Sequence, residues 1–319
     1  MTSFLNLNNN NFMSSVLGIC NDEDYISNYN NKICQVYAVF DGHGGKNLSR
    51  DLANGIDSIP SFCQFICNKF EEFDNSITVE EYIKTLFLEY DIILKNHHTG
   101  VIGSTATICL TFQDNIYIAH VGDSSALVIK DDNLIYESKN HNISEDILEK
   151  NRLADANVEV SSASDFIIKN NDEIQIIDGF YHNFKYFYLQ DSLAMTRAFG
   201  HFDVKSYKKL DDKDKLFSSS PLLVEPTIFK IPQEKGLQVV MASDGLWDVI
   251  IPDKKLEEIN FLINQANDMG ENIAENITKF AENRWKKEWI VISKDNTIFK
   301  TKMTHQKQWD DISCIYLKF

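Results

Sequence analysis

Residues 36–45 read Val-Tyr-Ala-Val-Phe-Asp-Gly-His-Gly-Gly, an apolar run that ends on an acidic residue with glycine beside it. The same arrangement recurs at 119–124, Ala-His-Val-Gly-Asp-Ser, and at 239–248, Val-Val-Met-Ala-Ser-Asp-Gly-Leu-Trp-Asp. Each apolar run predicts a strand, and glycine lets the backbone turn sharply and approach a ligand closely because it has no Cβ. We therefore expect carboxylates to be delivered to several strand ends.

Seven acidic positions would converge if these strands are neighbours: Glu23, Asp24, Asp41, Asp123, Asp244, Asp248 and Asp310. Carboxylates gathered in one cleft repel one another and raise their pKa values unless a cation neutralises them. Oxygen ligands without clustered His or Cys favour Mg²⁺ or Mn²⁺ over zinc or copper. Two such ions bridged by a carboxylate can activate a water for in-line attack on phosphorus. His43, two residues after Asp41, is near enough to protonate the departing alkoxide.

Each of these features also has a structural alternative. A single Asp-Gly pair is usually a turn, and a single histidine is usually structural. Three such steps after strand-like runs favour a site, and the same context makes His43 a catalytic candidate, whereas Trp247 is expected in the core. Cys63 and Cys67 lack partner His or Cys residues at zinc-site spacing, so free thiols are expected for all 6 cysteines.

Composition and charge restrict the class of protein. The 319 residues are 43% hydrophobic and 24% charged, which is ordinary for a globular protein. The 31 Lys and Arg against 47 Asp and Glu give a net charge of −16, which repels nucleic-acid backbones and anionic lipid surfaces. The sequence contains no apolar run of membrane-spanning length and does not start with the pattern of a signal peptide. A soluble, intracellular protein in the cytoplasm, the nucleus or both is expected.

Periodicity predicts strands and helices without a steady βαβ alternation. Short β-branched and aromatic runs predict strands at 34–40, 104–112, 115–120, 125–129, 237–242 and 311–319. Helical spacing of apolar residues predicts helices at 79–95, 144–156 and 270–285, the first with a capping box of Thr78 and Glu81. Several strands are almost continuously apolar, as expected when both faces are buried. The pattern favours an α+β fold built from stacked layers.

One domain is expected, because the 5 Pro and 13 Gly form no recognisable linker. Residues 1–14, with their run of asparagines, are expected to be a flexible lead-in, and 15–319 the domain itself. Three polar, weakly periodic stretches near 158–188, 204–221 and 286–308 are expected to be surface insertions. Substrate choice or regulation could reside there, because exposed loops vary without disturbing a core.

A set of segments, in order along the chain, resembles the metal-dependent protein serine/threonine phosphatases of the type 2C (PPM) family. They are VFDGHGG (39–45), GSTAT (103–107), AHVGDSSALV (119–128), LAMTRAFG (193–200), EPTIF (225–229), VVMASDGLWDV (239–249) and DDISCIYL (310–317). The resemblance spans about residues 15–319. It implies a four-layer αββα sandwich, in which two central, mostly antiparallel sheets are flanked by helices, with a binuclear metal centre at one end.

The resemblance assigns metal-ligand roles to six positions: Asp41 as the carboxylate bridging both ions, Gly42 through its backbone carbonyl, Asp244 and Asp310 on one ion, and Glu23 with the supporting Asp24 on the other. Asp123 and Asp248 match positions that help to hold a weaker third ion, and Thr105 lines that region. His43 falls on the position of the general acid. The implied cofactors are two Mn²⁺ or Mg²⁺ ions per chain, with a weaker third.

One departure from the family pattern concerns the substrate phosphate. The family has an arginine that grips this phosphate four residues before the glutamate, and Ile19 stands there in this chain. Lys46, Arg50 or Arg197 would have to supply the missing charge. A surface or structural role is the alternative for each of these three residues.

Two further departures lie close to the expected site. Gly200-His201 stands where the family reads Gly-Asp, and Asp310-Asp311 stands where it reads Asp-Asn. Neither change removes an aligned metal ligand. The second adds a charge beside the site and leaves the choice of ligand between Asp310 and Asp311 open.

Together these features predict a phosphatase that hydrolyses phosphoserine and phosphothreonine by attack of a metal-bridging hydroxide, without a phosphoenzyme, and with His43 as general acid. The alternative is a pseudophosphatase, a binding or regulatory module with weak or no turnover, because the phosphate arginine is absent. A hydrolase of small phosphomonoesters is a third possibility. Phosphoprotein substrates, no nucleic-acid or membrane partner and a monomeric chain are expected.

Overall fold

The computed structural model describes residues 12–142, 146–155, 160–162, 165–170, 173–177, 180–182, 193, 195–205, 220–251, 254–286, 288–292, 298–302 and 309–319. Its helices are α1 (Asn47–Asn54), α2 (Phe62–Glu71), α3 (Val79–Lys95), α4 (Ile147–Asp155), α5 (Phe202–Lys205), α6 (Asp244–Trp247), α7 (Lys255–Met269) and α8 (Ile273–Trp285). Its strands are β1 (Phe12–Leu17), β2 (Asp24–Asn30), β3 (Cys34–His43), β4 (Gly103–Ser104), β5 (Ala106–Phe112), β6 (Asn115–Val121), β7 (Ser125–Lys130), β8 (Asn133–Glu137), β9 (Val160–Ser162), β10 (Asp165–Asn170), β11 (Glu173–Ile177), β12 (Phe180–His182), β13 (Phe199–Gly200), β14 (Thr227–Pro232), β15 (Leu237–Ala242), β16 (Glu288–Ile292), β17 (Ile298–Lys302) and β18 (Ile312–Lys318).

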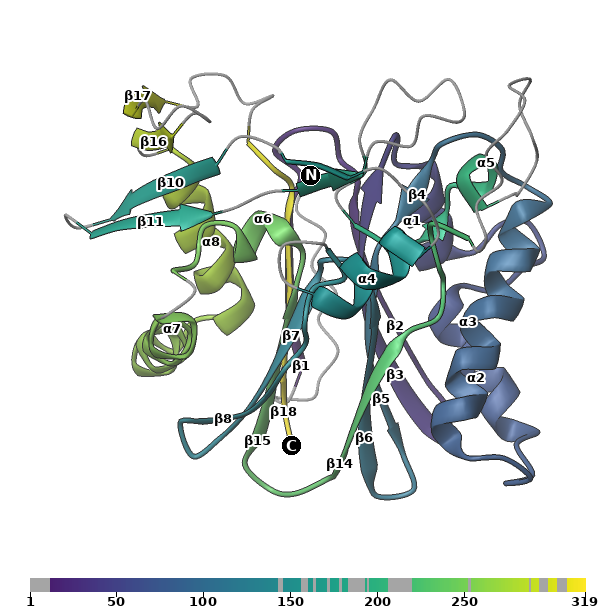
Figure 1. The fold of residues 1–319 in the computed structure, drawn as a ribbon. Coiled ribbons are helices and arrows are strands. Elements are labelled where there is room, and N and C mark those ends of the chain that lie inside the picture. The colour runs from purple at the N-terminus through teal and green to yellow at the C-terminus, as the bar shows by residue number, and fades with distance from the viewer. Residues whose placement is uncertain are drawn as a thin grey trace, which may run out of the picture.

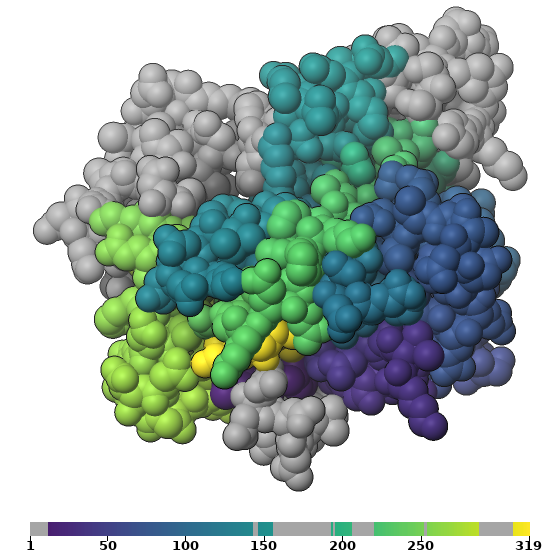
Figure 2. Space-filling model, turned by 90° about the horizontal axis from the view of Figure 1, so that it is seen from below, coloured from purple at the N-terminus to yellow at the C-terminus, as the bar shows by residue number. Residues whose placement is uncertain are grey.

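Two antiparallel sheets stack face to face, with helices on both outer faces (Figure 1). One sheet has the order β1-β18-β15-β7-β8, and the other contains β2, β3, β5, β6 and β14, with the short β4 and β13 beside β3. Helices α1, α2 and α3 cover the second sheet, and α6, α7 and α8 cover the first. Seen from below, α7 and α8 (yellow-green) lie on one side of the molecule and α2 and α3 (blue) on the other, with the strands between them (Figure 2). The expected four-layer α+β sandwich is confirmed.

Each space between layers holds its own apolar cluster. Phe62 and Phe87 belong to the cluster between the first three helices and their sheet. Val39 and Met241 belong to the cluster between the two sheets, and Trp247 to the cluster under α7 and α8. Because both faces of the central strands are covered, β5 is buried at every position, as its continuous apolar run predicts.

Local capping explains where the helices begin and end. Thr78 Oγ1 accepts a 3.2 Å hydrogen bond from Glu81 N, so α3 starts as predicted and runs to Lys95. The helix predicted at 270–285 is α8, which starts at Ile273, and Gly270, at a φ of 68°, ends the preceding α7 in the left-handed conformation. The helix predicted at 144–156 is α4. Helices α1, α2 and α7 were not predicted, although the cap of Ser61, which accepts from Gln64 N, was a signal for α2.

The structure describes parts of the expected lead-in and of the three expected insertions. Strand β1 begins at Phe12 and pairs with β18, so residues 12–14 belong to the sheet and not to a lead-in. Parts of 158–188 and 286–308 form β10, β11, β16 and β17, which join in one four-stranded sheet. The rest of these two stretches and most of 204–221 lie outside the described residues.

All 6 cysteines are free thiols. Among the described helices, none combines the length and apolar character required to cross a bilayer.

Candidate metal centre

Strand ends bring four aspartates together at one end of the sandwich. Asp24, at the start of β2, pairs in register with Asp41, near the end of β3. Asp244 follows β15 as the first residue of α6, and Asp310 precedes β18, the neighbour of β15. Electrostatic interactions link the side chains of these four residues directly. They come from segments up to about 290 residues apart in the sequence, and the sheets make them neighbours.

Burial and mutual repulsion raise the pKa values of these carboxyls. Desolvation, followed by the charges of Asp244, Asp24 and Asp310, raises the pKa of Asp41 well above its usual range. Burial raises the pKa of Asp24 to about 8, although Ser243 Oγ donates a 2.7 Å hydrogen bond to its Oδ2. Burial also raises the pKa values of Asp244 and Asp310. The charged neighbours that act most strongly on Asp41 are all carboxylates, so this cluster favours a cation.

The donor set suits a hard divalent cation, but its oxygens do not yet surround one point. Asp41 and Asp244 share a side-chain hydrogen bond, and Asp244 Oδ1 is buried without a hydrogen-bond partner among the described residues. In this part of the chain, no three His, Cys, Asp or Glu side chains form a ready metal-holding group. All-oxygen donors fit Mg²⁺ or Mn²⁺, which would offset the repulsion between these carboxylates.

Close backbone packing surrounds Gly42. A Cβ at this position would lie 2.5 Å from Ser49 Oγ and 3.0 Å from the carbonyl oxygen of Glu23. That carbonyl accepts hydrogen bonds from Gly42 N at 3.1 Å and from Ser49 Oγ at 2.6 Å. The Glu23 carboxylate accepts a 3.2 Å hydrogen bond from Asn21 Nδ2. Glu23 therefore adjoins the aspartates through its backbone, and its carboxylate lies in the loop before β2.

Asp123 borders the cluster through the hydroxyl of its neighbour. Ser124 Oγ lies 2.6 Å from Thr105 Oγ1, which accepts a 3.2 Å hydrogen bond from Asp41 N. Asp123 itself is buried. Asp248, at the C-cap of α6, is exposed and interacts electrostatically with Asp310. The two residues assigned to a weaker third ion therefore lie at the edge of the cluster.

Asp311 holds the loop that precedes β2. Its Oδ1 accepts hydrogen bonds from Ile19 N at 2.6 Å and Cys20 N at 2.7 Å, and its Oδ2 accepts one from Glu23 N at 2.7 Å. Asp310 accepts a 2.9 Å bond from Asp311 N and interacts with the other aspartates. This arrangement distinguishes the two: Asp310 belongs to the carboxylate cluster, and Asp311 positions the backbone around Glu23.

We expect Asp311→Asn to lower the thermal stability of the protein. An asparagine keeps one acceptor but turns an NH₂ group toward Glu23 N, so a hydrogen bond to a buried charge is lost. The loss should be about 2 kcal/mol, or about 4 °C in Tm, measured by thermal denaturation. The matched control is Asp310→Asn, which removes a repelled carboxylate and leaves the loop intact, so it should not lower the Tm of the metal-free protein. A larger loss in the control would contradict this assignment.

Two of the three candidate phosphate-gripping cations are already paired. Arg197 donates to Glu149 Oε1 from Nη2 at 2.6 Å and from Nε at 3.0 Å. Burial alone would raise the pKa of Glu149, but the hydrogen bonds from Arg197 and other partners lower it. Arg50 lies 2.9 Å from Asp51. Lys46 is exposed at the start of α1, and its ammonium makes no ion pair with a described residue.

His43 ends β3, two residues after Asp41. Its Nε2 is buried without a hydrogen-bond partner among the described residues. Burial lowers the pKa of His43 to about 4, so the free ring is neutral at pH 7.

The roles of Ser49 and Ser243 were not predicted from the sequence. The Ser49 hydroxyl donates a hydrogen bond to Glu23 O, and the Ser243 hydroxyl donates one to Asp24. The position of Ser243 directly before Asp244 was the available signal.

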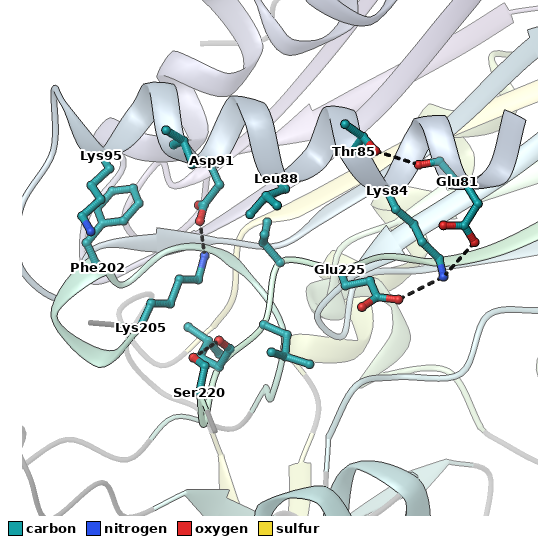
Figure 3. Close-up of a pocket in the computed structure, with 14 residues that line it drawn as sticks. Glu81, Lys84, Thr85, Leu88, Asp91, Lys95, Phe202, Lys205, Ser220 and Glu225 are labelled. Atoms are coloured by element: carbon teal, nitrogen blue, oxygen red, sulfur yellow. Dashed lines mark hydrogen bonds and ion pairs between the residues drawn. The ribbon is translucent and has the colours of Figure 1, made fainter. Parts of the chain in front are cut away.

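A separate pocket of about 550 Å³ lies between α3 and residues 220–225 (Figure 3). Lys84 and Glu225 form an ion pair of 3.0 Å on its wall, and Asp91 pairs with Lys205 at 2.8 Å. None of the predicted site residues lines this pocket. The candidate chemistry therefore lies in the carboxylate cluster and not in this hollow.

Comparison with known proteins adds to this geometry. A family model described as Protein phosphatase 2C matches residues 5–288. "Probable protein phosphatase 2C 45" of Oryza sativa subsp. japonica is 24% identical over 236 residues, which cover 74% of this chain and 68% of the relative. "Protein phosphatase 1B" of Rattus norvegicus is 26% identical over 247 residues, which cover 74% of this chain and 55% of the relative. The chain spans between 48% and 68% of the length of the first three such relatives.

A solved structure shares the fold. The serine-threonine phosphatase 2C from Toxoplasma gondii is similar with a TM-score of 0.63 and 15% sequence identity. The similarity covers 100% of this chain and 98% of that chain, so it extends over both sheets and both helical layers.

Proposed function

Since the chain belongs to the protein phosphatase 2C family, we propose that it is a metal-dependent protein phosphatase acting on phosphoserine and phosphothreonine. The observation that carries this proposal is the buried group of aspartates at the ends of β3 and β15 and the start of β18. Burial and like charges raise their pKa values, and divalent cations offset that repulsion at neutral pH.

Two Mn²⁺ or Mg²⁺ ions would be held by the carboxylates of Asp41, Asp244, Asp310 and Glu23, with the supporting Asp24 and the backbone carbonyl of Gly42. Asp123 and Asp248 would hold a weaker third ion. When bound, such ions lower the pKa of a coordinated water toward neutrality, which makes it a nucleophile for phosphorus. The chain supplies the frame: Thr105 N donates a 2.8 Å hydrogen bond to Asp41 O and Asp311 anchors the loop of Glu23. A rigid frame keeps the carboxylates in place when the substrate arrives.

His43 would give a proton to the leaving group. In-line attack breaks the bond between phosphorus and the seryl or threonyl oxygen, and that oxygen needs a proton as it departs. The ring is neutral in the free protein, because burial lowers its pKa to about 4. The doubly negative phosphate of a bound substrate favours the protonated ring, since a nearby opposite charge raises the pKa of a histidine. His43 would therefore hold its proton chiefly in the substrate complex.

Turnover of a phosphoserine peptide with and without Mn²⁺ tests this function. We expect no activity after chelation and restored activity when Mn²⁺ is added back. Retained Mn²⁺ binding without turnover would identify a pseudophosphatase instead. Hydrolysis of p-nitrophenyl phosphate but not of phosphopeptides would identify a hydrolase of small phosphomonoesters.

Lys46 is the residue that we expect to grip the substrate phosphate. Ile19 packs against the apolar cluster under α7 and α8, and Arg50 and Arg197 are paired with carboxylates. Lys46→Ala should raise KM for a phosphopeptide by about 10-fold or more, the effect of losing one charge-assisted hydrogen bond, without changing Mn²⁺ affinity.

The matched control for Lys46→Ala is Lys32→Ala, at the opposite end of the β2–β3 hairpin from Asp41. It should leave KM unchanged. An unchanged KM in the Lys46 variant would show that the phosphate is gripped by another group.

A further inference from the structure

His43 and His201 stack beside Gly103. Strand β4 lies between β3 and β13, so that His43 and Gly200 both pair with Gly103. The ring centroids of the two histidines are 5.1 Å apart, and the ring planes differ by 19°. A Cβ at Gly103 would lie 2.1 Å from the His201 ring, so a residue with any side chain would displace that ring. Glycine at this position makes the stacking possible.

Packing, rather than hydrogen bonds, fixes the orientation of the two imidazole rings. His43 Nε2 and both ring nitrogens of His201 are buried, and within the described ranges none has a partner at hydrogen-bond geometry. The backbone of Val101 offers the His201 ring a weak hydrogen bond that falls outside this geometry. A catalytic histidine is normally oriented by a third group. For His43, the stacked ring of His201 is the contact that can perform this task.

The backbone of His201 is held in a conformation that side chains rarely adopt. Its φ is 48°, in the left-handed region. His201 N donates a 2.7 Å hydrogen bond to Ile102 O, and its carbonyl accepts one from Val204 N at 2.9 Å. Residues in this region persist where their surroundings over-determine them, and they cluster at functional sites.

A buried ion pair anchors the chain on both sides of His201 (Figure 3). Lys205 Nζ, in α5, donates a 2.8 Å hydrogen bond to Asp91 Oδ2, in α3. Asp91 Oδ1 accepts a 2.8 Å hydrogen bond from Gly200 N. The residue before His201 and the helix after it are thus both tied to α3, so the His201 ring has a rigid base.

We propose that His201 is a positioning residue for His43: its ring sets the plane of the His43 imidazole and thereby the direction in which the proton reaches the leaving oxygen. This inference rests on the proposed phosphatase function, in which His43 is the proton donor. His201 stands where the family pattern has an aspartate, so the pattern itself does not supply this stacked ring. Displacing a catalytic group by about 1 Å can lower a rate about 100-fold, so a stacked neighbour can have a large effect.

Two substitutions separate the ring from the backbone. His201→Asn removes the ring but tolerates the left-handed conformation, and His201→Phe retains a ring that can stack. For a phosphoserine peptide we expect kcat to fall about 10- to 100-fold in the Asn variant, with KM little changed, and about 3-fold or less in the Phe variant. Hydrolysis of p-nitrophenyl phosphate, whose leaving group needs little protonation, should be nearly unaffected in both. Equal losses on the two substrates, or a Phe variant as impaired as the Asn variant, would overturn the proposal.

A double-mutant cycle shows whether His201 acts through His43. In a His43→Ala background, His201→Asn should lower kcat no further, because the group that it positions is gone. Losses that multiply would mean that His201 acts independently, which would overturn the inference.

NMR provides a measurement that does not depend on turnover. The imidazole signals of His43, identified as those lost in His43→Ala, should shift in His201→Asn and stay in place in the control His97→Ala, which changes an exposed ring. If the wild type does not turn over, the proposed function fails, yet this shift still reports on the stacking. Unshifted His43 signals would overturn the positioning role.

Discussion

Asp244→Asn should lower Mn²⁺-dependent kcat by about 10³-fold or more. Asp244 interacts directly with Asp41 and with Asp310, and its Oδ1 is buried without a hydrogen-bond partner among the described residues. Asparagine has nearly the same shape but no charge, so it removes one anionic ligand while the surrounding packing stays. A catalytic metal contributes several kcal/mol of transition-state stabilisation, and about 4 kcal/mol corresponds to about 10³ in rate. Asp41→Asn should have a similar effect.

Thermal denaturation distinguishes a lost metal site from a damaged fold. The metal-free Asp244→Asn protein should be at least as stable as the metal-free wild type, because a carboxyl whose charge raises the pKa values of Asp41 and Asp310 is gone. The rise in Tm that Mn²⁺ produces in the wild type should disappear. Asp132→Asn, on the exposed turn between β7 and β8, is the matched control and should keep both turnover and the Mn²⁺ response. Wild-type turnover of Asp244→Asn at saturating Mn²⁺ would refute the metal centre.

His43→Ala should lower kcat for a phosphoserine peptide by about 10²- to 10⁴-fold, the range of general acid catalysis. The seryl oxygen is a poor leaving group and needs the proton that His43 supplies. An aryl phosphate leaves as a stable phenolate, so its hydrolysis should fall much less. Steady-state kinetics on both substrates measures this difference directly.

The control for His43→Ala is the same substitution at His97, an exposed residue after the end of α3. It should leave both rates unchanged. If His43→Ala reduces the two rates equally, His43 acts as a structural residue and not as the proton donor.

Local features of the sequence were enough to predict the central strands. Near-continuous apolar runs predicted β3, β5, β6, β7, β15 and β18 at almost their final bounds. Burial on two faces selects such runs whatever their partners are, so the signal is local. The Thr78 cap placed the start of α3 for the same reason, because a capping hydrogen bond spans only three residues. The helix predicted at 270–285 is α8, whereas α7, which Gly270 ends in the left-handed conformation, was not predicted.

The sequence also determined which residues are candidates for the metal centre, since an acidic residue after an apolar strand lies at a sheet edge in any layered fold. Only the tertiary structure decided what each candidate does. Asp310 and Asp311 are neighbours in sequence, yet one interacts with the aspartates and the other accepts three backbone hydrogen bonds from residues 19–23. Arg197 is a candidate phosphate ligand by its sequence alone, but in the structure Glu149 pairs with it. The stacking of His201 on His43 likewise depends on the register of three strands. Such contacts join residues tens to hundreds of positions apart, and strand register, which no local pattern specifies, selects them.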